Sequence, residues 1–289
     1  MPDYGIIDAH VHIAPIRMMN PRALALMQQR RPEFDFLLSV MDSPEVLLRH
    51  MDAEGVERLV AINYVSPDVI GFTEEVNSWV VNYTRHAPGR LLPCGSVDPR
   101  RSKDPGGDTE RIIEMGIRLI KIHPPHQLLY PNAYLEGVTG LADIYRAAER
   151  LGIPVMFHTG TSIFEGARNR YGDPLFLDDV AVDFPKLKII VAHGGRPLWM
   201  DNAVFLVRRH PNVYLEVSSI PPRKLLEYFP RLEEMAGKTL FGSDWPGPLV
   251  PGMGQNIRDF LALPLSDAAK RKMLRSNALR VLWNESEQI

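Results

Sequence analysis

Four short segments of the chain place histidine or aspartate at the expected end of a β-strand. They read Asp8-Ala-His10-Val-His12, Phe157-His158-Thr-Gly, Val191-Ala-His193-Gly-Gly and Phe241-Gly-Ser-Asp244-Trp-Pro. Imidazole and carboxylate ligands suit a borderline divalent ion such as zinc, and manganese, iron or cobalt also fit. We therefore predict one divalent ion, with Zn²⁺ preferred, bound by His10, His12, His158 and Asp244.

The first of these segments holds two histidines at a spacing of two residues. Side chains alternate between the faces of a strand, so His10 and His12 project to the same side. Two buried imidazoles need polar partners, and a shared cation supplies them. A His-x-His pair alone is weak evidence, whereas four such segments at strand ends form a consistent ligand set.

The expected chemistry follows from this ligand set. A catalytic ion with an open position lowers the pKa of a bound water from about 15.7 to about 7. We assign Asp244 to accept the proton from that water and to pass it to a leaving group. His193 is interpreted as a residue that polarises a carbonyl or transfers a proton, and a ligand role for it is left open.

The elements that must position these residues alternate along the whole chain. Short β-branched runs predict strands at residues 6–12, 58–63, 92–97, 118–123, 154–158, 188–193, 213–217 and 239–243. Apolar positions at helical spacing predict helices at residues 44–54, 72–86, 108–115, 141–151, 176–184, 198–209, 223–235, 255–263 and 267–282. Ser266 is the expected N-cap of the last helix.

Strands that alternate with helices in this way indicate βα units and a parallel sheet. Eight such units in 289 residues predict the α/β class and one (β/α)8 TIM barrel that spans residues 1–289 as a single domain. No Gly-x-Gly-x-x-Gly motif follows the first strand, which disfavours a dinucleotide-binding fold. In a barrel the ends of different strands converge on one axis, so the four segments would meet.

Two connections after strand ends are longer than a turn requires. Residues 14–43 follow the first strand and carry Arg17, and residues 159–174 follow the fifth strand and carry Arg168. We expect them to form extended βα loops over the C-terminal face of the barrel, where substrates bind. Arg17 and Arg168 are candidate substrate contacts, and the alternative is that they are solvated surface charges.

The composition of the chain limits the kinds of molecule that it is expected to bind. The chain is 45% hydrophobic and carries a net charge of −2, without a block of like charges that would indicate nucleic acid or an anionic membrane as partner. No apolar stretch reaches the roughly 18 residues of a membrane span, and no signal-peptide pattern is present. The single cysteine, Cys94, excludes an internal disulfide. We expect a cytoplasmic protein that acts on a small molecule.

The sequence resembles the amidohydrolase superfamily, and within it the amidohydrolase 2 branch that includes aminocarboxymuconate semialdehyde decarboxylase. The similarity lies in the four segments above, in Ile120-Lys121-Ile-His123-Pro124 and in Asn277-Ala-Leu-Arg-Val-Leu282, and it covers essentially the whole chain. The resemblance implies a barrel, usually one divalent ion in this branch, and commonly a homodimer.

The fourth predicted strand leaves the number of ions open. Some superfamily members bridge two metals with a carboxylated lysine at this strand, and Lys121 shares a strand face with His123. We favour one ion, with Lys121 unmodified and both residues facing the substrate. The alternative is two ions about 3.5–4 Å apart.

Two reactions fit the same residues. The first is hydrolysis of a lactone, amide or ester by a metal-activated water, which we favour because it uses the expected site unchanged. The second is non-oxidative decarboxylation of a small aromatic or muconate-type acid. A non-catalytic binding barrel is disfavoured because every expected position is filled. A TatD-type nuclease would have a glutamate where this chain has Ile-Lys-Ile-His.

Overall fold

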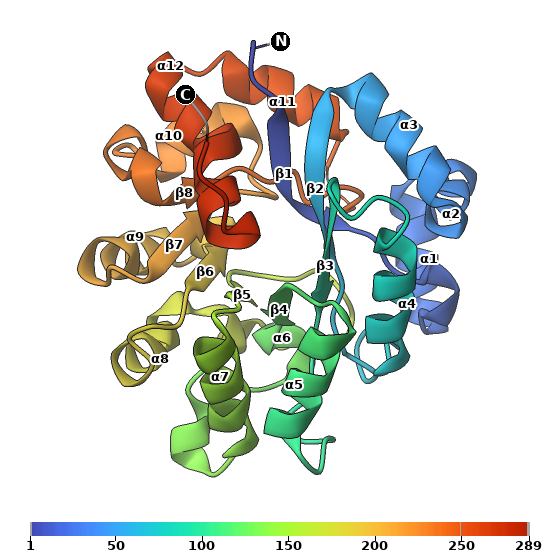
Figure 1. Cartoon of the computed structure of the whole chain (residues 1–289), viewed down its shortest axis with the longest axis vertical. Helices are drawn as coiled ribbons and strands as arrows, with labels where there is room; N and C mark the ends of the chain where they lie inside the picture. Colours follow the sequence, from blue (N-terminus) through green and yellow to red (C-terminus); the bar gives the residue numbers. More distant parts are fainter. Residues whose placement is uncertain (1, 249, 288–289) are drawn as a thin grey trace.

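The computed structural model describes residues 2–248 and 250–287, and eight parallel strands form its centre (Figure 1). Neighbouring strands in the sheet follow the order of the chain from the first to the eighth. The strands are β1 (Ile6–His12), β2 (Val56–Ile62), β3 (Leu91–Gly95), β4 (Leu119–Ile122), β5 (Val155–His158), β6 (Ile189–Ala192), β7 (Val213–Glu216) and β8 (Thr239–Leu240).

The sheet closes on itself through the segment that follows β8. The backbone N–H of Ala9 donates to Phe241 O at 3.0 Å, and that of His12 donates to Trp245 O at 2.7 Å. The N–H of Asp244 returns a bond to His10 O at 2.8 Å. These bonds join the last strand region to β1, so the predicted (β/α)8 barrel is confirmed. They also fix Asp244 beside the two histidines of β1.

Helices surround the barrel, as Figure 1 shows. The α-helices are α1 (Pro21–Arg30), α2 (Phe34–Asp42), α3 (Pro44–Glu54), α4 (Glu75–Thr84), α5 (Pro105–Met115), α6 (Pro124–Gln127), α7 (Gly140–Leu151), α8 (Leu177–Asp183), α9 (Met200–Arg209), α10 (Leu225–Tyr228), α11 (Met253–Leu261) and α12 (Asp267–Arg271). Within residues 2–248 and 250–287, none of the helices combines the length and the apolar character that crossing a bilayer requires.

Local sequence signals explain several helix ends. Ser43 accepts a hydrogen bond from Val46 N–H at the start of α3, where Pro44 occupies the first helical position. Ser266 accepts a bond from Ala269 N–H, which confirms it as the N-cap of α12. Every residue of β4, β5 and β6 is buried, as expected for a parallel sheet covered on both faces.

The connection after β1 differs from the prediction of an extended loop. Residues 14–43 contain the helices α1 and α2. Asn20 caps α1 by accepting a bond from Ala23 N–H, and Pro21 stands at its first position. The sequence therefore carried a helix-start signal at Asn20 and Pro21, although the length of the connection suggested an extended loop.

Two predicted helices were wrong as continuous elements. The segment 223–235 is divided into α10 and a 3₁₀ turn at Glu233–Lys238, because Pro230 between them lacks an N–H and cannot continue a helix. The segment 267–282 begins as α12 and continues in turns of the wider π type at Lys272–Ser276 and Leu279–Trp283. The first of these segments packs against β1 and β8.

Candidate active site

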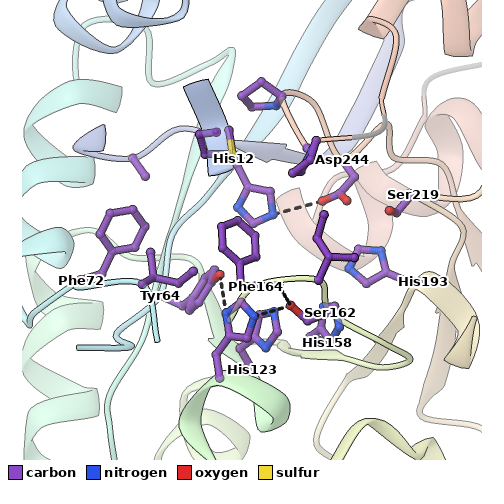
Figure 2. Close-up of a pocket in the computed structure, with 18 of the residues that line it drawn as sticks. His12, Tyr64, Phe72, His123, His158, Ser162, Phe164, His193, Ser219 and Asp244 are labelled. Atoms are coloured by element: carbon purple, nitrogen blue, oxygen red, sulfur yellow. Dashed lines mark hydrogen bonds and ion pairs between the residues drawn. The ribbon is translucent and has the colours of Figure 1, made fainter. Parts of the chain in front are cut away.

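The predicted site residues lie where strands end at the C-terminal face of the barrel. His10 and His12 belong to β1, and His158 is the last residue of β5. His193 follows β6 directly, and Asp244 follows β8. Figure 2 shows His12, His158, His193 and Asp244 around one pocket. Parallel strands bring these residues together although they are spread over most of the chain.

Three of these side chains converge closely. Ligand atoms of His10, His193 and Asp244 all lie within 4.8 Å of one another. His12 Nε2 lies 3.1 Å from Asp244 Oδ1, and His10 Nε2 lies 3.5 Å from the same oxygen. The structure thus places His193, for which the sequence analysis preferred a non-ligand role and left a ligand role open, within this group.

His158 stands slightly apart from this group. Its ring centroid lies 4.7 Å from that of His193 and 3.8 Å from that of His123. Its Nε2 is buried and has no hydrogen-bond partner among the described residues, and the same holds for His10 Nε2. Burying a polar nitrogen without a hydrogen-bond partner costs folding free energy, so we expect these two atoms to bind a ligand.

The residues present fit a divalent ion. Burial lowers the pKa of His10, His158 and His193 well below the usual value, which keeps the imidazoles neutral and their lone pairs available. Burial alone would raise the pKa of Asp244, but the hydrogen bond with His12 and the positive charge of Arg196 lower it. Neutral imidazoles beside an ionised carboxylate are the donor set of a zinc or manganese site.

A second layer of hydrogen bonds orients two of the histidines. His10 Nδ1 lies 2.8 Å from Glu216 Oε2. Ser218 Oγ donates to Glu216 Oε2 at 2.8 Å and lies 2.9 Å from His193 Nδ1. With their Nδ1 atoms bonded in this way, both histidines leave Nε2 available as a ligand, and His10 Nε2 lies 3.5 Å from Asp244 Oδ1.

Asp8 supports the backbone rather than a histidine ring. Its Oδ1 accepts bonds from the N–H groups of His10 at 3.1 Å and Ser243 at 2.9 Å. Burial raises the pKa of Asp8 to about 7, although the bonds from Ser243 and His10 act in the opposite direction. Asp8 therefore ties β1 to the segment that carries Asp244.

Backbone conformation at the site is unusual. His193 has φ of 66° and Asp244 has φ of 67°, both in the left-handed region that glycine favours. Such a conformation costs a non-glycine residue about 1–3 kcal/mol and persists where the surrounding structure holds it. His193 follows β6 directly and Asp244 lies four residues beyond the end of β8, and both residues line the pocket.

Lys121 and His123 differ in their access to the pocket. Lys121 is fully buried within the barrel and does not line the cavity, and its Nζ has no hydrogen-bond partner among the described residues. Burial lowers the pKa of Lys121 to about 8, against the attraction of Cys94, Glu216 and Asp244. His123 lines the cavity and stacks between His126 and His158, with ring centroids 3.6 and 3.8 Å away.

His126 connects the pocket wall to the loop after β5. Its Nδ1 lies 3.0 Å from Tyr64 Oη, and its Nε2 lies 2.7 Å from Ser162 Oγ. In Figure 2 dashed lines mark these bonds at Tyr64 and at Ser162. Burial lowers the pKa of His126 to about 3, so the ring is neutral and one of its nitrogens accepts a bond. The loop after β5 is thereby fastened to the pocket wall.

The two arginines expected to contact substrate lie outside the cavity lining. The Arg17 side chain is 70% exposed and pairs with Asp42 at 2.9 Å. Arg168 is exposed in the loop after β5. Arg196, which the sequence patterns did not single out, lines the cavity instead. The feature of the sequence that could have identified Arg196 is its position directly after His193-Gly-Gly, a segment that follows a predicted strand.

The cavity has a volume of about 320 Å³ and a lining that is partly polar and partly apolar. Its polar lining includes His193, Asp244 and Ser219, which lie on the same side of the view in Figure 2, and Arg196, which donates to Ser219 Oγ at 2.7 Å. Its apolar lining includes Ile16, Met19, Met27, Met41, Ile70, Phe72 and Phe164. A lining of this kind fits a small molecule that has a reactive polar group on a hydrophobic body.

Comparison with known proteins places the chain in a family. The amidohydrolase family profile matches residues 7–282, so the chain belongs to the amidohydrolase family. This confirms the resemblance described above and makes the protein an enzyme of that superfamily.

Solved structures show the same fold at low sequence identity. An uncharacterised TIM-barrel protein from Bordetella bronchiseptica is 23% identical, with a TM-score of 0.76 over 97% of this chain and 99% of that chain. A probable 2-pyrone-4,6-dicarboxylic acid hydrolase from Acinetobacter baumannii is 15% identical, with a TM-score of 0.67 over 97% and 100%. A 5-carboxyvanillate decarboxylase from Novosphingobium aromaticivorans, solved with bound manganese, is 15% identical, with a TM-score of 0.67 over 97% of each chain.

Proposed function

We propose that this amidohydrolase is a metal-dependent hydrolase that opens a small lactone, amide or ester. The observation that carries the proposal is the position of Asp244, whose Oδ1 lies 3.1 Å from His12 Nε2 and 3.5 Å from His10 Nε2 beside an open cavity. An ionised carboxylate at the edge of a ligand group can take a proton from a water that approaches from the cavity.

His10, His12, His158 and Asp244 would hold the ion, and His193 is close enough to join them. A divalent ion bound there supplies Lewis acidity, which polarises a substrate carbonyl and acidifies water near neutral pH. We prefer zinc, and the manganese in the decarboxylase from Novosphingobium aromaticivorans makes manganese the second choice. Glu216 and Ser218 keep the histidine rings in the orientation that presents Nε2.

Residues of the chain would carry out proton transfer, charge stabilisation and substrate binding. Asp244 accepts the proton from the attacking water and returns it to the leaving oxygen or nitrogen. His193 lines the pocket, where it can stabilise charge on the carbonyl oxygen or move a proton. The apolar walls with Phe72 and Phe164 hold the body of the substrate and exclude bulk water.

Decarboxylation of a small acid is the second candidate. The observation that favours it is Arg196, a cation in the lining of a largely apolar cavity, which suits an acid with a hydrophobic body. Relatives of this fold include both a probable dicarboxylic acid hydrolase and a carboxyvanillate decarboxylase, so either reaction is consistent with the family.

One assay separates the two reactions. Protein loaded with Zn²⁺ or Mn²⁺ is incubated with a panel of cyclic lactones, including pyrones, and with aromatic and muconate-type acids. Ring opening that depends on the added metal supports hydrolysis. Release of carbon dioxide without ring opening would reverse the order of the two candidates. Failure of the chain to take up any divalent ion would refute both.

A further inference from the structure

Tyr64, His126 and Ser162 form a row of linked side chains in the cavity wall, and the proposed reaction uses none of them. All three residues line the cavity. His126 Nδ1 lies 3.0 Å from Tyr64 Oη, and His126 Nε2 lies 2.7 Å from Ser162 Oγ. Tyr64 follows β2, His126 belongs to α6, and Ser162 lies in the loop after β5. Three separate parts of the chain therefore meet in this row.

Aromatic side chains of the cavity lining flank the row. The ring centroid of Tyr64 lies 6.3 Å from that of Phe72, and the ring centroid of His126 lies 5.5 Å from that of Phe164. Both phenylalanines line the cavity. The few polar groups of a largely apolar pocket usually fix the orientation of a ligand and decide its specificity. The row is therefore a candidate for recognition of a polar group on the substrate.

The pKa values in the row disfavour a nucleophilic serine. Burial lowers the pKa of His126 to about 3, and burial raises the pKa of Tyr64 above its usual value. A general base works best with a pKa near the working pH, so an imidazole of such low basicity is a poor acceptor for the proton of Ser162. All three groups are uncharged near neutral pH, and the row holds hydrogens in place instead of transferring them.

The row has one more hydrogen than its internal bonds use. Tyr64 and Ser162 each have one O–H and the neutral imidazole has one N–H, so three hydrogens serve two bonds. A phenol is a stronger acid than an alcohol and therefore the better donor. This favours the order in which Tyr64 donates to His126 Nδ1 and the Nε2–H group donates to Ser162 Oγ.

The surroundings of Ser162 support this order. The backbone N–H of Phe164 also donates to Ser162 Oγ, at 3.3 Å. With bonds from Phe164 and His126, both lone pairs of the serine oxygen are occupied. Ser162 Oγ makes no further hydrogen bond within residues 2–248 and 250–287. Its own hydrogen is therefore available to a ligand in the cavity.

We propose that Ser162 donates this hydrogen to an uncharged oxygen on the apolar body of the substrate, and that Tyr64 and His126 are positioning residues that fix the donor. The inference rests on the proposed function in taking this cavity as the substrate site. The oxygen is a carbonyl, ether or hydroxyl oxygen separate from the group that reacts. Successive hydrogen bonds polarise one another, which strengthens the bond at the end of the row.

The test uses two ligands that differ in one acceptor. In para-acetylbenzamide a carbonyl oxygen takes the place of the terminal methylene group of para-isopropenylbenzamide, and both ligands are uncharged and similar in shape. The meta isomers cover a second direction of the substituent. Calorimetric titration gives the ratio of the two dissociation constants, for protein loaded with Mn²⁺ and again after chelation.

The proteins are wild type, Ser162→Ala, Tyr64→Phe and the variant with both changes. Ser39→Ala and Tyr134→Phe are the matched controls. The hydroxyls of Ser39 and Tyr134 also donate hydrogen bonds, and neither residue lines the cavity.

We expect wild type to bind the acetyl ligand of at least one pair about three- to tenfold more tightly than its partner, the range of one neutral hydrogen bond. Ser162→Ala should remove this preference and Tyr64→Phe should reduce it. The double variant should match Ser162→Ala, because Tyr64 acts through Ser162. Both controls should keep the wild-type ratio. This pattern without turnover of any lactone, amide or ester would support the donor and reject the proposed reaction.

Nitrogen NMR of the imidazoles gives a readout that needs neither ligand nor metal. The proposed order requires the proton of His126 on Nε2, and the signals that disappear in His126→Gln identify this ring. A proton on Nδ1 would leave the free donor on Tyr64 and overturn the assignment to Ser162.

Three titration results would also overturn the proposal. An equal loss of affinity for both ligands in Ser162→Ala would make Ser162 only a fastening of its loop. An acetyl preference that survives in Ser162→Ala would place the donor elsewhere. Wild type without a preference in either pair would show that no donor faces the ligand, and turnover of a lactone in that case would leave the proposed reaction intact.

Discussion

Replacement of Glu216 by glutamine tests how the second layer of hydrogen bonds supports the metal ligands. Glu216 is fully buried, and its Oε2 lies 2.8 Å from His10 Nδ1 and accepts a bond from Ser218 Oγ at 2.8 Å. Its Oε1 accepts a bond from Ser218 N–H at 2.6 Å. Both oxygens of this residue therefore act as acceptors.

An amide cannot reproduce this pattern in either orientation. If the amide nitrogen faces His10, that ring must move its proton from Nδ1 to Nε2, and Nε2 can then no longer bind an ion. If the nitrogen faces the other way, it meets the N–H of Ser218, donor against donor. Changes in this layer lower metal affinity by roughly 10–100-fold, which is about 1.4–2.7 kcal/mol.

We expect Glu216→Gln to bind Zn²⁺ or Mn²⁺ roughly 10–100-fold more weakly than wild type, as measured by competition with a chromophoric chelator. Glu227→Gln is the matched control, because Glu227 is exposed and pairs with Lys224 at the surface. Equal metal affinity in the two variants would refute the view that Glu216 fixes His10 as a ligand. Circular dichroism of both variants checks that the fold is kept.

Three further outcomes follow from the site. Gly242→Ala should lower the free energy of unfolding in urea by about 1–3 kcal/mol, because a Cβ there would lie 2.5 Å from Glu216 Oε1 and 2.7 Å from His10 Cβ; an unchanged urea midpoint would contradict this packing. Asp244→Asn should reduce turnover of a lactone at least about a hundredfold while much of the metal stays bound, and unchanged turnover would exclude proton transfer by Asp244. Chelation should abolish turnover, added Mn²⁺ or Zn²⁺ should restore it, and elemental analysis should give one ion per chain; two ions would support a carboxylated Lys121.

The barrel could be predicted from the sequence because its strands carry local signals. The structure confirms the expected bounds of β1 at Ile6–His12, and the other seven strands lie at or beside their expected positions. The strands of a parallel sheet are buried on both faces, and for this reason each appears in the sequence as a short run of apolar, often β-branched residues. Helix lengths were less certain, since capping residues such as Asn20 and breaks such as Pro230 act on single positions.

The sequence by itself also supplied the kinds of side chain at the site and their places at strand ends. The tertiary structure decided which of them meet. His193 lies beside His10 and Asp244, and its backbone adopts a left-handed conformation beyond β6, which no local pattern announced. Arg196 reaches the cavity while Arg17 pairs with Asp42 at the surface. The direction of a side chain after a strand depends on contacts between loops far apart in sequence, and only the folded chain brings those loops together.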